Sequence, residues 1–156
     1  MNTDEDIIAM VYSVFETEPC PEHFTNYLHC DECAEHDELL RHRDRSSLGI
    51  EDVNNQGWDP ICFITAEGWR YYLPALVRLA LESGKTEDDW YLPQFLFHLV
   101  GDGKENRRIK NCSDSQRKAI ATFLWYIVGT EANLIARYNI DNDLQMAIEI
   151  WSESPA

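Results

Sequence analysis

Cysteine and histidine side chains are concentrated in one short stretch, residues 20–42, which holds three of the five cysteines and four of the five histidines. Thiolate and imidazole are the donors that Zn²⁺ prefers, and a two-residue gap lets a single turn present two donors to one ion. Two pairs have this gap and stand six residues apart: Cys20 with His23, and Cys30 with Cys33. We therefore predict that the segment 20–36 binds zinc.

The predicted ligands are Cys20, His23, Cys30 and Cys33, a Cys3His set of the closed, structural kind. His29 and His36 are rival ligands, and on a helix His36 lies one turn after Cys33. A structural zinc can contribute on the order of 10 kcal/mol to folding. Here it would join two helices across a loop for which the sequence shows no other support. The alternative is that these are ordinary cysteines beside solvated histidines.

Two other chemistries are open to the same segment. In a zinc hydrolase, three of the donors would hold the metal, and Glu22, Glu32 or Glu35 would act as the base for a zinc-bound water. In a redox or metal sensor, Cys30 and Cys33 would form a reversible disulfide and release the metal. The sequence contains no nucleophile elbow, phosphate loop or dinucleotide fingerprint, so no catalytic residue is assigned.

Charge indicates the kind of partner. The formal net charge is −15, and residues 1–40 contain eleven Asp or Glu and no Lys or Arg. Binding nucleic acid requires a basic surface that neutralises phosphates, so a nucleic acid is not expected as a partner. The locally basic stretch 104–118 is interpreted as a solvated loop and helix start. An acidic surface suits solubility or attraction to a basic protein.

Length and hydropathy predict one globular domain, residues 1–156, of which 44% are hydrophobic. No apolar run approaches the roughly 20 residues that span a bilayer, so no membrane contact is expected. The acidic N-terminus lacks the basic start of a signal peptide. These features predict a cytoplasmic protein, where thiols stay reduced and a Cys/His cluster indicates metal binding or catalysis rather than disulfides.

Apolar periodicity predicts an all-α fold of five or six helices with little or no sheet. Thr3, Thr65 and Ser113 are the expected N-caps, the last in a Ser-x-x-Gln capping box. The run 61–64 is expected to be a strand or a buried extended segment. Cys62 is expected in the core, Cys112 in a loop and His98 as a satisfied core histidine. The expected helices begin near Thr3, Asp31, Thr65, Asp88, Ser113 and Asp141, and the fifth extends to Tyr138.

The segment 63–75, Phe-Ile-Thr-Ala-Glu-Gly-Trp-Arg-Tyr-Tyr-Leu-Pro-Ala, resembles a family of small bacterial proteins of unknown function. The family is marked by Phe-x-Thr-x-Glu-x-aromatic-Arg-Tyr-Tyr-Leu-Pro-Ala, and the Cys/His block is similar to that of a subgroup. The resemblance covers about half of the chain. It implies a compact helical fold and no assigned activity. From the residues alone, Trp69, Tyr72 and Leu73 recur at helical spacing and predict a core stripe.

Together these features favour a non-enzymatic, zinc-stabilised acidic protein that acts by binding another protein, and the acidity suits a basic partner. An immunity or antitoxin-type protein is the most concrete version. The zinc hydrolase and the thiol-based sensor are the alternatives.

Overall fold

The structure is a computed structural model in which residues 2–84 and 89–152 are described. These residues form nine α-helices and two short 3₁₀ helices, and the described part contains no strand, which confirms the all-α prediction. The predicted helix start at Asp88 lies outside the described residues. In chain order the elements are α1 (Asp4–Val14), α2 (Asp31–Arg41), α3 (Ile50–Val53), η1 (Pro60–Phe63), α4 (Ala66–Glu82), α5 (Leu92–Val100), η2 (Gly103–Glu105), α6 (Arg107–Lys110), α7 (Asp114–Thr130), α8 (Ala132–Tyr138) and α9 (Asp141–Ser152).

Side-chain caps fix the starts of the long helices as predicted. Thr3 and Asp6 form a reciprocal capping box at α1, and the Thr65 hydroxyl accepts a hydrogen bond from the Gly68 amide at α4. Ser113 and Gln116 form the capping box of α7. Each cap satisfies backbone N–H groups that have no partner within the helix.

Two segments differ from the prediction. The helix expected to extend to Tyr138 is broken at Glu131, whose backbone is not helical, and α7 and α8 meet at 92°. Gly129 and Thr130 precede the break, and both are weak helix formers. The run 61–64 is a 3₁₀ turn followed by one extended residue, because the Asp59 carboxylate caps the Ile61 amide at 2.9 Å.

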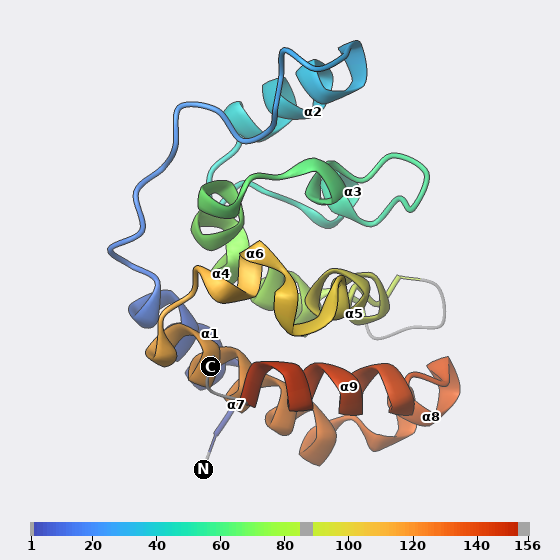
Figure 1. The fold of residues 1–156 in the computed structure, drawn as a ribbon. Helices are drawn as coiled ribbons and strands as arrows, with labels where there is room; N and C mark the ends of the chain where they lie inside the picture. Colours follow the sequence, from blue (N-terminus) through green and yellow to red (C-terminus); the bar gives the residue numbers. More distant parts are fainter. Residues whose placement is uncertain (1, 85–88, 153–156) are drawn as a thin grey trace.

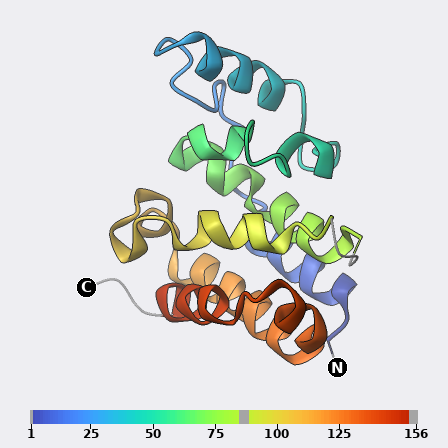
Figure 2. The same ribbon diagram turned by 90° about the vertical axis from the view of Figure 1, so that its right-hand side faces the viewer.

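The helices are arranged in tiers (Figures 1 and 2). α7, α8 and α9 lie together in the lowest tier, α4 and α5 cross above them, and α2 lies at the opposite end of the molecule. A long irregular segment leads from α1 past the middle tier to α2. The predicted metal-binding segment is therefore remote from the C-terminal helices.

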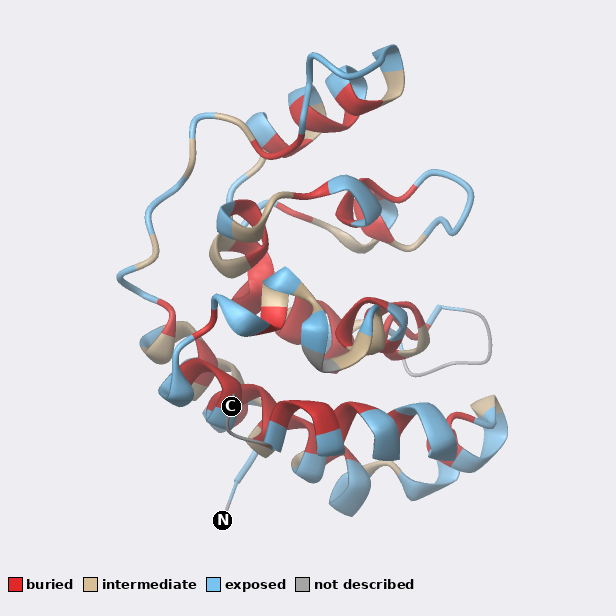
Figure 3. Cartoon of the chain, in the orientation of Figure 1, coloured by how far each residue is buried: buried red, intermediate tan, exposed pale blue. Residues whose placement is uncertain are grey.

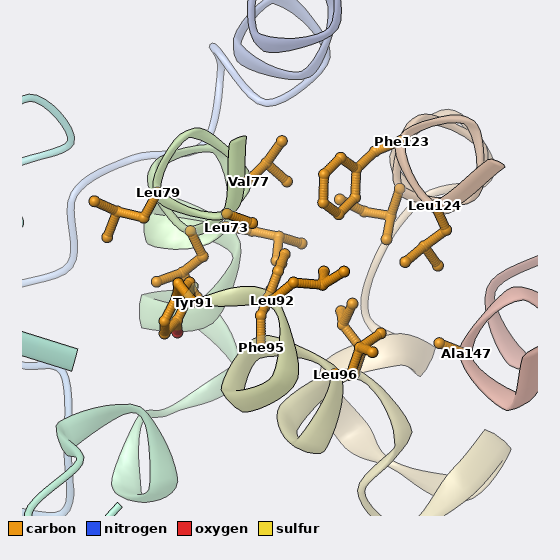
Figure 4. Close-up of a cluster of buried hydrophobic side chains, with 14 of the residues drawn as sticks. Leu73, Val77, Leu79, Tyr91, Leu92, Phe95, Leu96, Phe123, Leu124 and Ala147 are labelled. Atoms are coloured by element: carbon orange, nitrogen blue, oxygen red, sulfur yellow. The ribbon is translucent and has the colours of Figure 1, made fainter. Parts of the chain in front are cut away.

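The core lies between the lower tiers. Leu73 and Val77 of α4, Phe95 of α5 and Phe123 of α7 point toward one another, and all are fully buried (Figure 4). The inner faces of α7 and α9 are buried and their outer faces are exposed (Figure 3). Trp69 is also fully buried, along with Tyr72 and Leu73, which confirms the predicted core stripe.

One of the three single-residue expectations outside the Cys/His segment needs correction. His98 is buried and hydrogen-bonded, as predicted. Cys62, expected in the core, is exposed, because only one side of the short helix η1 is covered. Cys112 lies in the loop between α6 and α7, as predicted. It is buried there, and its thiol lies 3.1 Å from the Arg108 carbonyl.

Among the described residues no single helix is long and apolar enough to cross a membrane. Only α7 and α8 taken together reach that length and composition, and they are sharply bent relative to each other.

Candidate metal centre

The candidate metal centre is built around Cys30, the residue directly before α2. Cys30 has an extended backbone and occupies the N-cap position, where its sulfur accepts a hydrogen bond from the Cys33 amide at 3.4 Å. An N-cap acceptor also faces the positive end of the helix dipole, which favours a negatively charged group. The C-x-x-C spacing therefore places one thiol on the helix end and the second in its first turn.

Three donor atoms converge at this point. One donor atom each from His29, Cys30 and Cys33 lies within 4.8 Å of the other two. The two sulfurs are 3.3 Å apart, and Cys33 Sγ is 3.7 Å from His29 Nδ1. In a tetrahedral zinc site the corresponding distances are about 3.8 Å and about 3.6 Å, given the usual bond lengths. These two distances are thus within about 0.5 Å of the edges of a zinc tetrahedron, and the third, between His29 and Cys30, is no more than 4.8 Å.

The two thiols differ in acidity. Hydrogen bonding with the Cys33 amide, with His29 and with the Cys33 thiol lowers the pKa of the Cys30 thiol to about 7. The pKa of Cys33 is raised, first by its hydrogen bond to Cys30 and then by burial. Cys30 is therefore the more acidic thiol of the pair, and thiolate is the form that binds metals and attacks disulfides.

The remaining predicted ligands lie elsewhere in the described part of the chain. Cys20 is exposed and contacts the Pro21 carbonyl at 3.7 Å. The His23 ring stacks on Tyr27 with centroids 3.8 Å apart, and its Nδ1 is 2.7 Å from an Asp37 oxygen. Neither residue belongs to the converging group. The ligand set of Cys20, His23, Cys30 and Cys33 stays a prediction, of which the structure brings Cys30 and Cys33 together.

His36, the alternative ligand, is fully buried and points away from the three donors into the contact between α2 and η1. Its ring lies 4.6 Å from Trp58 and 5.0 Å from Phe63, centroid to centroid. Its Nε2 is 3.7 Å from a Glu32 oxygen, beyond hydrogen-bond distance, and neither ring nitrogen has a hydrogen-bond partner. In this arrangement His36 packs as an aromatic residue.

Asp37 holds the loop before α2 in place. Its buried carboxylate accepts hydrogen bonds from the amides of Phe24 at 2.6 Å and Thr25 at 3.2 Å, besides the contact with His23. Burial alone would raise the pKa of Asp37, but His23 and the two amides outweigh it and lower the pKa below its usual value. The Thr25 hydroxyl also donates to the Cys33 carbonyl at 2.7 Å. The expectation that this loop has no support besides zinc is therefore wrong.

Two residues of the centre were missed or underrated from the sequence. His29 was only a rival ligand, because it adjoins Cys30 and so breaks the two-residue spacing rule. Asp37 was not singled out, since one acidic residue among eleven in the first 40 carries no distinguishing signal. The one available hint is position: Asp37 is one turn after Cys33, on the inner face of an amphipathic helix.

Comparison with known proteins identifies the family but adds no activity. The profile of a family of unknown function, DUF6714, matches residues 3–154. The chain belongs to this family. The match extends over almost all of the described residues, so the Cys/His segment and the Trp69 helix lie within the same family region. No curated protein and no solved structure matches the chain.

Proposed function

We propose that this DUF6714 member is a non-enzymatic, zinc-stabilised protein that acts by binding another protein. The convergence of His29, Cys30 and Cys33 at the start of α2 carries the proposal. One imidazole and two thiols form a donor set that suits zinc, and the low pKa of Cys30 makes the first thiolate available near neutral pH. A fourth ligand would close the site.

His23 is the residue best suited to supply that ligand. Asp37 holds its Nδ1 at 2.7 Å, which is how a carboxylate orients a metal-binding imidazole and leaves the second nitrogen for the ion. Its ring stacks on Tyr27, two residues before His29, so His23 belongs to the same loop as that donor. Cys20 and His36 are the other predicted sources.

The surface beside the centre supports a protein partner. Leu28 is 81% exposed and Tyr27 is 37% exposed, and both precede His29 directly in the chain. A metal that fixes His29 would also fix these two side chains, which lowers the entropy lost when they are buried by a partner. Because the first 40 residues carry no Lys or Arg and many acids, the complementary partner is basic. A toxin neutralised by this chain is one concrete form of such a partner.

The first test is metal content. The protein is purified without a metal-affinity tag, and its zinc is measured by mass spectrometry beside a Cys30→Ser/Cys33→Ser variant. We expect the variant to lose one equivalent of zinc and to melt at a lower temperature. Equal zinc in both proteins would overturn the metal centre.

The second test addresses binding. Partners that co-purify from the native cells are identified, and one of them is titrated against Leu28→Glu with zinc content checked in parallel. Met146→Glu is the matched control, since Met146 is also exposed (48%) but belongs to α9 in the lowest tier. We expect Leu28→Glu to weaken binding at least tenfold with zinc retained. Equal binding by both variants would exclude this surface.

A thiol switch is the second candidate, favoured by the 3.3 Å distance between the two sulfurs and the low pKa of Cys30. Hydrogen peroxide would take two electrons and two protons from the thiols, forming the disulfide and two waters and releasing the metal. Mass spectrometry should show the loss of two hydrogens together with zinc release, both reversed by a dithiol reductant. Oxidation without zinc release would contradict the switch. The zinc hydrolase has no comparable supporting contact and stays a prediction.

A further inference from the structure

A second group of metal donors lies where η1 packs against α5. One donor atom from each of Asp59, Cys62 and His98 lies within 4.8 Å of the other two. Asp59 and His98 are buried, with 2% and 4% exposure, whereas Cys62 is at the surface. This group therefore extends from the interior to the solvent, on elements distant in sequence from the first centre.

The Asp59 carboxylate fixes the imidazole. Its Oδ2 is 2.7 Å from His98 Nε2 and accepts a hydrogen bond from Gln94 Nε2 at 2.6 Å, while its Oδ1 accepts from the Ile61 amide. This contact holds the two side chains next to each other, and an ion that binds both would replace it, because two ligands of one ion stand about 3.3 Å apart. Asp59 caps η1 and His98 belongs to α5, so the two side chains are brought together before any ion binds.

The spacing suits one ion. Bond lengths of about 2.0–2.3 Å in a tetrahedral site place neighbouring donors about 3.3–3.8 Å apart. Donors already within 4.8 Å of one another reach these separations by side-chain rotations that move atoms about 1 Å. The three residues would supply one oxygen, one nitrogen and one sulfur ligand, and zinc binds all three kinds of atom.

Two buried hydrogen-bond donors next to α5 have no partner. They are Tyr91 Oη and Trp69 Nε1. Tyr91 directly precedes α5, and the Trp69 ring lies 6.5 Å from the His98 ring. Buried donors without an acceptor are unusual, so the surroundings of His98 are not fully satisfied by the protein alone.

The charges of the three ligands suit a divalent ion. A cysteine binds a metal as the thiolate, so the Cys62 thiol would give up its proton to an ion bound here. Arg108, which donates to the Ile61 carbonyl at 2.7 Å, is the positive group facing the site and opposes the cation. The carboxylate and the thiolate together supply the two negative charges that match a divalent ion.

We infer that Asp59, Cys62 and His98 form a second divalent transition-metal site, for which Zn²⁺ is the best-suited ion. Three protein ligands are the number found in open rather than closed zinc sites. The site thus differs in kind from the centre at α2, and it does not depend on the proposed function.

The experiment counts metals on the whole chain. Zinc is measured by mass spectrometry, and Co²⁺ is added to the metal-free protein to record the thiolate-to-cobalt absorption. The proteins compared are the parent, Cys62→Ser, Cys30→Ser/Cys33→Ser and the control Cys112→Ser, whose thiol is buried outside both groups. Cys62 is exposed, so its replacement by serine leaves the fold intact.

We expect two equivalents in the parent and the control, and one equivalent in each of the other two variants. His98→Gln should lose the same equivalent as Cys62→Ser. A parent that binds one equivalent, retained in Cys62→Ser and lost in Cys30→Ser/Cys33→Ser, would overturn the second site and leave the first intact. A second equivalent that is unaffected by Cys62→Ser would also overturn it.

Discussion

The two Cys/His regions share a buried aspartate that contacts a histidine, but the surroundings of the two pairs differ. Asp37 and Asp59 are both buried carboxylates that contact a histidine and accept from backbone amides. At α2 the imidazole partner, His23, keeps 28% of its side chain exposed, whereas at α5 the partner, His98, keeps 2%. The first pair supports a surface loop and the second is part of the interior.

Because of this difference, the centre at α2 can adapt to its ligand, whereas the group at η1 and α5 is largely preorganised. The donors at α2 come from one chain segment, and a loop residue is still needed to complete the predicted four-ligand site. The donors at η1 and α5 come from two packed elements and are fixed by tertiary contacts. A site on a loop can respond to metal or oxidation, while a site on packed elements is ready before binding but costs stability if it is disrupted.

The sharpest test of this contrast is to remove each carboxylate. Asp59→Ala leaves the His98 and Gln94 side chains and the Ile61 amide without their acceptor in the interior, and we expect a loss of about 3–5 kcal/mol in the free energy of unfolding. Asp37→Ala should cost about 1–3 kcal/mol, because His23 can turn to solvent. Denaturant titrations of the metal-free variants would measure both losses.

Asp→Asn at the same positions is the control, because it keeps an acceptor and the side-chain volume. Both asparagine variants should lose less stability than the alanine variants. Equal losses for the two alanine variants would mean that the Asp37 pair is as rigidly buried as the Asp59 pair, and the contrast between the regions would fail.

A smaller effect is expected where the two regions meet. Gly68 of α4 lies between the loop before α2 and the end of η1, and an added Cβ would stand 2.8 Å from Ile64 Cγ1 and 2.9 Å from Phe24 Cδ1. Overpacking costs about 1–3 kcal/mol, against a gain of about 1 kcal/mol in helix propensity. Gly68→Ala should therefore lower the free energy of unfolding by about 1 kcal/mol.

Gly129→Ala is the matched control, since its added Cβ would meet nothing within 4 Å. There only the propensity term acts, and we expect a gain of about 0.5–1 kcal/mol, measured by thermal and denaturant unfolding. A stabilising Gly68→Ala would show that Phe24 and Ile64 move aside freely, so that the junction does not couple the loop to the core.

The sequence predicts what depends on neighbouring residues. The caps at Thr3, Thr65 and Ser113 and the core stripe around Trp69 follow from spacings of three and four, and all are present. The break at Glu131 does not follow, because apolar periodicity continues through it. Local sequence patterns therefore predict the helices better than they predict where one helix ends and the next begins.

The same limit applies to the sites. Cys30 and Cys33 are adjacent in space because they are adjacent in sequence, and spacing rules find them. Asp59, Cys62 and His98 have no common spacing, and a cysteine that has no partner at ligand spacing predicts a core residue. Only the packing of η1 on α5 brings the three together, and that contact has no sequence signature.

The smallest expected effect is on the rate at which Cys30 reacts with a disulfide reagent. This rate is also the most direct probe of the centre at α2. A thiol with a pKa of about 7 is half ionised at pH 7, whereas an unperturbed thiol with a pKa near 8.5 is ionised to about 3%. Lower basicity reduces the intrinsic nucleophilicity about fivefold, so the net advantage toward a disulfide reagent is about threefold at pH 7. The rate should rise as pH increases and level off above about pH 7.5, while that of an ordinary thiol keeps rising toward pH 9.

The measurement uses metal-free Cys20→Ser/Cys62→Ser protein and an aromatic disulfide reagent, so that Cys30 is the exposed thiol that remains. Adding Cys30→Ser should remove the fast phase and leave the buried Cys33 and Cys112 to react slowly. A rate that keeps rising beyond pH 8 would mean that the Cys33 amide and His29 do not hold Cys30 as a thiolate. The loop would then lack the preorganised charge that a metal or an oxidant requires, and the interior group would be the better metal site of the two.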